Sequence, residues 1–170
     1  MRRLTLATAV ALGLSVLPRP AAAGPLLEGS VGVSWQLEPT MVRAPVSVML
    51  APGWGFAGIL KVELGLAGNL ADTQNSQFDL ELRPMVVVSP PLFPLYLRGI
   101  AVVQNLLHGP TKPGYGGALG VSFGLFGVGV FVEAGAVARQ ITVPSASVPP
   151  VDQDVYRWYA EGRAGVSYEF

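Results

Sequence analysis

Apolar and polar side chains alternate along most of this chain with a period of two residues. In the final segment, the positions from Trp158 to Phe170 divide into an apolar or small set and a polar set that contains Glu161, Arg163 and Glu169. Successive side chains of a β-strand point to opposite faces, so this period predicts strands. A strand with one charged face does not fit an ordinary apolar core, because its charges need water or paired partners.

The same alternation recurs in eight segments. They are residues 27–37, 42–50, 56–66, 78–88, 95–104, 118–125, 128–139 and 158–170. The uncharged run from Gly116 to Val132 would also suit a transmembrane helix, but its alternation on both sides of Phe126 and Gly127 favours two strands. The fourth segment contains Pro84, which removes one ladder hydrogen bond and predicts either a bulge or an early strand end.

The connections between these segments alternate in length and polarity. The short or proline-containing ones read APGW, SPPLFP and FG, and the longer, more polar ones read EPTMVRAP, GNLADTQNS, NLLHGPTKPGY and TVPSASVPPVDQD. In a series of antiparallel hairpins, alternate connections lie at opposite ends of the sheet. Short turns at one end and long loops at the other are typical of outer-membrane β-barrels.

Most of the charges fall on one phase of the alternation, opposite an apolar phase. We expect these thirteen residues to face inward and form a structural network of ion pairs: Glu28, Arg43, Lys61, Glu63, Asp79, Glu81, Arg83, Arg98, Glu133, Arg139, Glu161, Arg163 and Glu169. In hydrocarbon every backbone polar group must be paired internally, which a sheet achieves by closing on itself. The pattern therefore predicts an all-β fold, an eight-stranded antiparallel up-and-down transmembrane β-barrel. Eight strands enclose a space about wide enough for side chains, so we expect a closed lumen.

Aromatic residues gather near the ends of the predicted strands, where interfacial girdles belong. They are Trp35, Trp54, Phe56, Phe93, Tyr96, Phe126, Tyr156, Trp158, Tyr168 and Phe170. Ordinary strand composition is the alternative explanation for this set.

The amino terminus has the layout of a secretory signal peptide. Arg2 and Arg3 precede an apolar run, which ends in prolines and in the small residues Ala21 and Ala23. We predict a signal peptide over residues 1–23 and a barrel domain over residues 24–170. A membrane anchor is disfavoured because the run is short for a bilayer crossing.

Composition excludes several classes of function. Hydrophobic residues make up 51% of the chain, charged residues make up 13%, and cysteine is absent. Without Arg2, Arg3 and Arg19, eight basic residues face eleven acidic ones, a net charge of about −3. A chain with no basic patch is not expected to bind nucleic acid. We expect no disulfide, no metal site and no cofactor, and no residue is assigned to catalysis, cofactor binding or metal binding.

With its signal peptide, eight amphipathic strands and final Val-Ser-Tyr-Glu-Phe, the chain resembles small outer-membrane β-barrels of the OmpA, OmpX and OmpW-like type. In that group the terminal aromatic residue belongs to the signal that the barrel-assembly machinery reads. The resemblance therefore implies an assembly signal at Val166, Tyr168 and Phe170. It also implies a bacterial outer-membrane location, contacts with outer-membrane lipid and lipopolysaccharide, and a monomer.

Three functions remain open from the sequence. They are a non-catalytic structural or adhesion-type barrel, a narrow conduit for small or apolar solutes, and a lipid A-modifying enzyme. The deacylases that share this architecture carry a serine two residues after their histidine, whereas Pro110 follows His108 here. We therefore interpret His108 as a solvated loop residue and favour the non-catalytic barrel. A secreted barrel of the lipocalin type is the soluble alternative, with apolar residues inside and charges outside.

Overall fold

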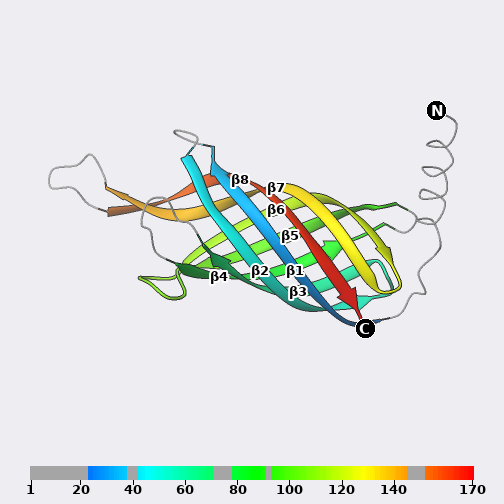
Figure 1. The fold of residues 1–170 in the computed structure, drawn as a ribbon. Helices are drawn as coiled ribbons and strands as arrows, with labels where there is room; N and C mark the ends of the chain where they lie inside the picture. Colours follow the sequence, from blue (N-terminus) through cyan, green and yellow to red (C-terminus); the bar gives the residue numbers. More distant parts are fainter. Residues whose placement is uncertain (1–22, 38–41, 71–77, 91–92, 145–151) are drawn as a thin grey trace, which may run out of the picture.

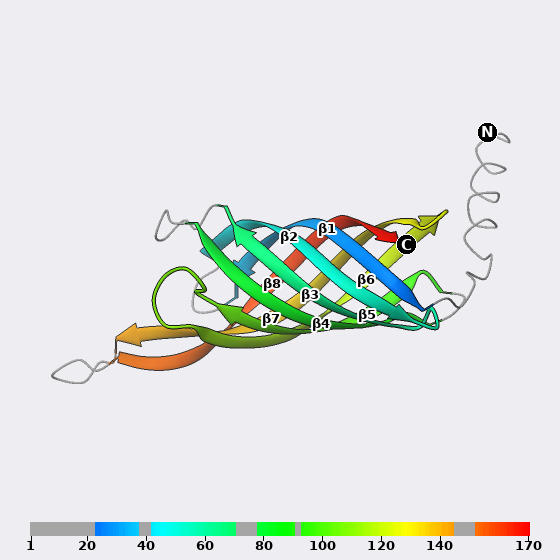
Figure 2. The same cartoon turned by 90° about the horizontal axis from the view of Figure 1, so that it is seen from below.

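The structure is a computed structural model that describes residues 23–37, 42–70, 78–90, 93–144 and 152–170. Eight strands form a closed barrel in which each strand pairs with its sequence neighbours and β8 pairs with β1 (Figures 1 and 2). The strands are β1 (Gly24–Gln36), β2 (Val42–Phe56), β3 (Leu60–Asn69), β4 (Asp79–Val88), β5 (Leu95–Gln104), β6 (Lys112–Leu125), β7 (Val128–Pro144) and β8 (Asp152–Glu169). All eight pairings are antiparallel, which confirms the predicted up-and-down barrel.

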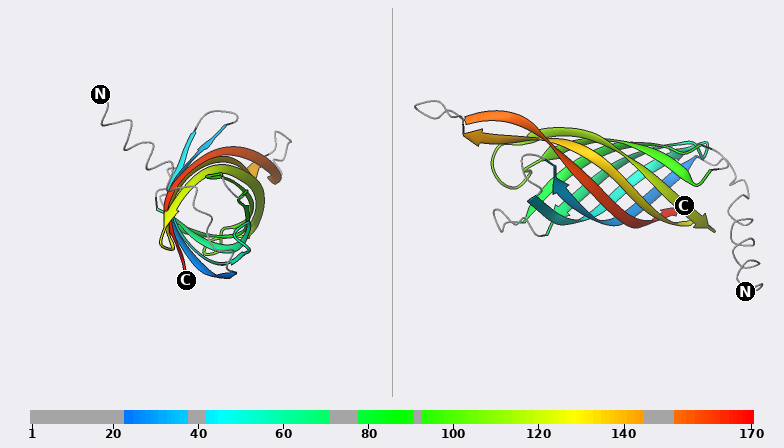
Figure 3. Two further views of the ribbon diagram at one scale, coloured as in Figure 1. Left: turned by 90° about the vertical axis from the view of Figure 1, so that its right-hand side faces the viewer. Right: turned by 90° about the horizontal axis from the view of Figure 1, so that it is seen from above.

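The two ends of the barrel differ, as the sequence predicted. Residues 57–59, 89–94 and 126–127 connect strands at the end that also carries Gly24 and Phe170, which we call the terminal end. Residues 37–41, 70–78, 105–111 and 145–151 connect strands at the opposite end, which we call the loop end. The β7–β8 hairpin extends beyond the other strands at the loop end (Figures 1 and 3).

The register around the barrel fixes how steeply the strands tilt. Following directly paired residues once around the barrel from Leu26 leads to Gln36, ten residues further along β1. The intermediate positions are Gly53, Glu63, Met85, Ile100, Gly116, Val137 and Tyr159. With the usual spacings along and between strands, this stagger corresponds to a tilt of about 40°. The barrel is consequently narrow, with room for one layer of side chains from each wall.

Several predicted strand boundaries are wrong. The sequence APGW is not a connection but lies inside β2, and Phe56 ends β2 instead of starting the third strand. The turn lies at residues 57–59, where Ala57 and Gly58 have φ angles of 52° and 68°. The sixth, seventh and eighth strands are longer than predicted, because pairing extends into the polar segments that we assigned to loops.

Pro84 causes neither the bulge nor the early strand end that we expected. Strand β4 continues through it, and Pro84 pairs opposite Leu64 on the β3 side without a register shift. On the β5 side, the ladder stops after Leu82 and resumes at Met85 in the same register. The missing N–H group of proline is therefore accommodated by a local gap in one ladder, which the flanking pairs hold in place.

The wall separates two kinds of surface. Outward-facing Val31, Leu64 and Val166 are 53%, 48% and 55% exposed, while the alternate positions are buried inside the barrel. The lumen holds charged groups together with an apolar cluster of Met49, Ala51, Ala67, Met85, Ile100, Val102 and Val137. This arrangement is the inverse of a lipocalin-type barrel. Among the described residues, no helix is long and apolar enough to cross a bilayer.

Candidate functional site

The lumen is the candidate functional site, because it gathers nearly all of the buried charge. Glu28, Glu63, Glu81, Arg83, Arg98, Glu133, Arg139 and Arg163 are all buried in it. They come from β1, β3, β4, β5, β7 and β8, so closure of the barrel is what brings them together. Burial of so many charges is tolerable only when each has a partner of opposite sign.

Nearer the terminal end, one arginine holds three carboxylates. The Arg98 guanidinium donates two hydrogen bonds to Glu28, at 2.8 Å and 2.7 Å, in a two-pronged geometry. Its Nε lies 3.2 Å from a Glu133 carboxylate oxygen, and its Nη1 lies 3.7 Å from Glu63. We call these four residues the Arg98 cluster. The planar guanidinium suits this role because it can present N–H groups to several carboxylates at once.

Nearer the loop end, two arginines hold two carboxylates in a closed ring. Arg83 contacts Glu81 and Glu161 at 2.8 Å each, while Arg139 contacts the same two carboxylates at 2.8 Å and 2.6 Å. We call these four residues the Arg83 cluster. Its formal charge is zero, and Asn69 donates a further hydrogen bond to Glu81.

Arg163 lies between the two clusters. Its guanidinium donates to the hydroxyl groups of Ser30 and Ser47, and its Nε is 4.0 Å from Glu133. Gly32 makes room for it, because a Cβ at that position would lie 3.0 Å from the guanidinium carbon. The two clusters therefore form one polar column along the barrel axis.

The remaining predicted lumen residues lie toward the ends of the barrel. Lys61 and Glu169 form a partly exposed ion pair of 2.7 Å at the terminal end. Asp79, at the start of β4, accepts hydrogen bonds from the backbone N–H groups of Leu80 and Leu107 and so anchors the loop at 105–111. The side chain of Arg43 is outside what the structure describes.

Sequence reasoning missed an ion pair at the loop end, because its residues were assigned to loops. Lys112 contacts Asp154 at 2.9 Å, and Thr142 donates a hydrogen bond to the same carboxylate and accepts one from Lys112. Asp154 lies on the part of the β7–β8 hairpin beyond the last β1–β8 pair, at Tyr159. Hydrogen bonds from Lys112 and then Thr142 lower the pKa of Asp154 below its ordinary value.

The prediction that Tyr96 belongs to the aromatic girdle is wrong. Its side chain is 3% exposed inside the lumen, where its hydroxyl donates to Glu133 at 2.8 Å and its ring meets Phe131 edge to face. Gly120, opposite Tyr96 on β6, provides the space, because a Cβ there would overlap the ring. The other nine aromatic residues of the set are exposed on the outside of the barrel.

A small cavity lies beside the charge clusters. A cavity of about 10 Å³ lies among Glu133, Glu161 and Arg163 and the small residues of β6 and β7. That volume is on the order of one water molecule. Side chains therefore fill this part of the lumen, in keeping with an eight-stranded barrel.

His108 does not belong to the charge clusters of the lumen. His108 is exposed in the loop at 105–111, and no described side chain hydrogen-bonds its ring. No cluster of three or more metal-ligating side chains occurs among the residues that the structure describes.

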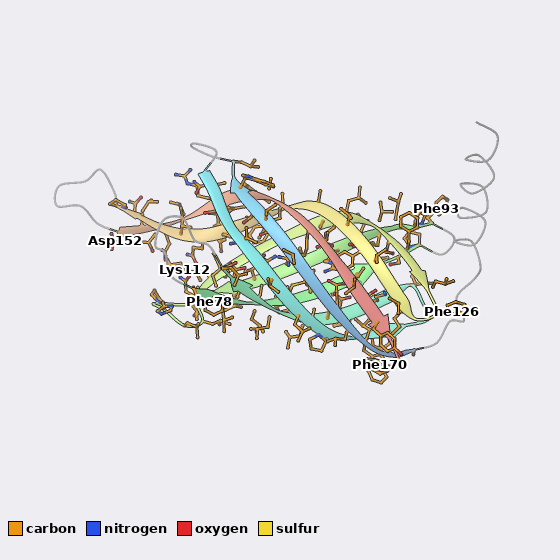
Figure 4. All side chains as sticks on the ribbon, in the orientation of Figure 1. Phe78, Phe93, Lys112, Phe126, Asp152 and Phe170 are labelled. Carbon is orange, nitrogen blue, oxygen red and sulfur yellow. The ribbon has the colours of Figure 1, made fainter. Side chains whose placement is uncertain are left out.

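The carboxyl terminus closes the barrel seam. Phe170 donates its backbone N–H to Pro25 at 3.1 Å, and its ring packs edge to face on Tyr168 at 4.8 Å. Phe170 is 74% exposed and lies at the terminal end together with Phe93 and Phe126 (Figure 4). Val166 and Tyr168 share the outward face of β8.

Comparison with known proteins supports the fold but identifies no family. No family model and no curated protein matches the chain. The crystal structure of Neisserial surface protein A is similar over 87% of this chain and 97% of that chain, with a TM-score of 0.51 and 14% identity. A de novo designed transmembrane β-barrel is similar over 91% of this chain and 100% of the design, with a TM-score of 0.48 and 15% identity. At these identities the likeness concerns the architecture, and it does not distinguish the OmpA, OmpX and OmpW-like groups.

Proposed function

We propose that this chain is a non-catalytic bacterial outer-membrane protein, whose barrel spans the bilayer and whose loops serve a structural or adhesion role. One observation carries the proposal: the outer wall is apolar while the charges are buried and paired inside. In water the exposed wall would be a very large apolar patch, far beyond what soluble monomers carry. In a bilayer the same wall is solvated by lipid, and the closed sheet leaves no backbone edge unpaired.

Membrane insertion and orientation can be tested directly in cells. The chain has no cysteine, so single cysteines can be introduced without background labelling. Leu107 lies exposed in a long connection and Phe126 in a short turn. We expect a membrane-impermeant maleimide to label Leu107→Cys in intact cells and Phe126→Cys only after the outer membrane is permeabilised. Recovery of the folded protein in the soluble fraction would contradict the proposal.

The paired charges of the lumen favour this function over a solute conduit. Glu81, Arg83, Arg139 and Glu161 form hydrogen bonds across the barrel and would have to separate before an ion could pass. We expect no steady single-channel current from the purified protein in a planar bilayer, with a water-filled porin as the positive control. A reproducible open state in the unmodified protein would favour the conduit instead.

We further propose that Val166, Tyr168 and Phe170 form the signal that the barrel-assembly machinery reads. The Phe170 ring at the terminal end packs edge to face on Tyr168 and is 74% exposed, which leaves it accessible. Phe170→Ala should lower the amount of assembled barrel in cells, yet the variant should refold in detergent with little loss of stability. Equal loss in both settings would assign Phe170 a purely structural role.

A further inference from the structure

Two arginines near the loop end of the barrel have N–H groups that lack acceptors. The Nε atoms of Arg139 and Arg157 are buried and form no hydrogen bond. Arg139 and Arg157 are directly opposite each other in the β7–β8 ladder. Directly opposed side chains of antiparallel strands lie about 5 Å apart at Cβ, so the two arginine side chains start from adjacent positions on the wall.

The charges around this pair do not balance. Arg139 is 6% exposed, and its terminal nitrogens already hold Glu81 and Glu161, whose charges Arg83 and Arg139 neutralise. Among the described residues, no carboxylate forms an ion pair with Arg157. Like charges directly opposite each other destabilise a sheet, and the buried Nε–H group of the half-buried Arg157 adds a desolvation cost because it has no acceptor. An anion would relieve both costs.

Further hydrogen-bond donors lie beside the Arg139–Arg157 pair. Gln104 is buried on β5, and its side-chain amide reaches the backbone oxygen of Gln140 at 3.5 Å, next to Arg139. This hydrogen bond is long and uses one of its two N–H groups, so the amide can still donate to another acceptor. Lys112 belongs to the same end but is held by Asp154. The site thus combines two guanidinium groups and an amide around one unmatched positive charge.

We propose that the loop end of the lumen binds a phosphate-type oxyanion between Arg139 and Arg157. A phosphate group has several acceptor oxygens and matches the N–H groups of two guanidiniums better than a monovalent halide does. The phosphate could be free inorganic phosphate or the headgroup of a lipid. The site depends on the lumen geometry alone and not on the proposed membrane role.

The test follows the arginine Nε–H resonances by NMR in the full-length mature chain refolded in detergent micelles. Inorganic phosphate is titrated at constant ionic strength, with chloride as the competing anion. We expect a saturable shift of the Arg139 and Arg157 resonances in the millimolar range. Arg157→Gln should weaken phosphate binding roughly tenfold or more, because a charge-assisted hydrogen bond is lost. Lys112→Gln is the matched control, because it removes a nearby cation that is already paired, and it should change the affinity about twofold or less.

The remaining outcomes either support the site or overturn it. A shift seen only with bicelles that contain phosphatidic acid, and not with inorganic phosphate, would support the site and assign the phosphate to a lipid. The absence of a saturable shift in both settings would overturn the proposal, as would an unchanged affinity in Arg157→Gln. Marked destabilisation of Arg157→Gln without phosphate binding would also overturn it, because the arginine would then have a protein partner.

Discussion

Replacing Arg98 with glutamine should destabilise the barrel more than any substitution of an exposed cation. Arg98 is 3% exposed, and it is 2.7 Å from Glu28, 3.2 Å from Glu133 and 3.7 Å from Glu63. The change removes the positive charge on which all three carboxylates converge. Arg163 is a remaining cation near this cluster, and it reaches Glu133 only at 4.0 Å.

The size of the stability loss depends on the buried carboxylates that remain after the substitution. At an effective dielectric constant of about 20, unit charges at these distances attract each other by roughly 5 kcal/mol per pair. While the cluster is intact, the desolvation of the guanidinium offsets much of this attraction, so the net contribution is small. After Arg98→Gln the carboxylates remain buried without that partner. Loss of one partner of a buried pair costs about 3–5 kcal/mol, and we expect the upper end because three carboxylates are affected.

Lys61 provides the matched control. Its ion pair with Glu169 is also 2.7 Å long, but the two side chains are 19% and 36% exposed. Because water replaces the lost partner there, Lys61→Gln should cost about 0–1 kcal/mol. Both variants would be compared by reversible denaturant unfolding in lipid vesicles, with the fluorescence of the outward-facing Trp35, Trp54 and Trp158 as the probe.

Two results would refute this reasoning. If Arg98→Gln and Lys61→Gln lost the same small free energy of unfolding, burial of charge would not govern the stability of the lumen. The second result concerns Glu28→Gln added to Arg98→Gln, which removes one stranded carboxylate and should restore roughly 1 kcal/mol or more. No recovery in the double variant would mean that Arg98 acts by filling space and not by its charge.

Further predictions concern the packing of the lumen and the projecting hairpin. Gly120→Ala should destabilise the barrel by about 1–3 kcal/mol, because the new Cβ would overlap the Tyr96 ring. Gly162→Ala is the control: its Cβ would meet no atom within 4 Å, so the substitution should be close to neutral in the same unfolding assay. The pKa of Asp154 should lie below the ordinary value of about 3.9 in an NMR titration and return toward it in Lys112→Gln. Because that pKa is lowered on folding, the stabilisation by Asp154 is present above the unfolded-state pKa and lost as the pH falls through the folded-state pKa. A titration of Asp154 that is unaffected by Lys112→Gln would contradict the assigned hydrogen bond.

Local pattern was sufficient for the strands and for the direction of their faces. Alternation assigns Val31 and Leu64 to one face and Glu28 and Glu63 to the other, and the structure exposes the first pair and buries the second. A period of two residues is a property of the extended backbone, so it needs no knowledge of partners. The same reasoning counted eight strands correctly and distinguished the ends of the barrel.

Strand boundaries and turns were harder to predict from the sequence, because pairing between strands determines them. The sequence APGW resembles a turn, yet Pro52 pairs opposite Leu27 inside β2, and the chain reverses five residues later at Ala57. Similarly, Lys112 begins β6 because it pairs with Gln104 of β5. A polar segment becomes a strand when a neighbouring strand is long enough to pair with it, which composition does not reveal.

The sequence by itself determined that this protein alternates apolar and charged faces in eight strands, and so that its charges had to meet inside a closed sheet. Only the tertiary structure decided which charges meet. Arg98 and Glu28 are 70 residues apart, and Arg83 and Glu161 are 78 apart. Their contacts depend on the stagger of ten residues between the two ends of a full circuit around the barrel. Stagger is a property of the whole closed sheet, because every ladder must agree before the last strand can pair with the first.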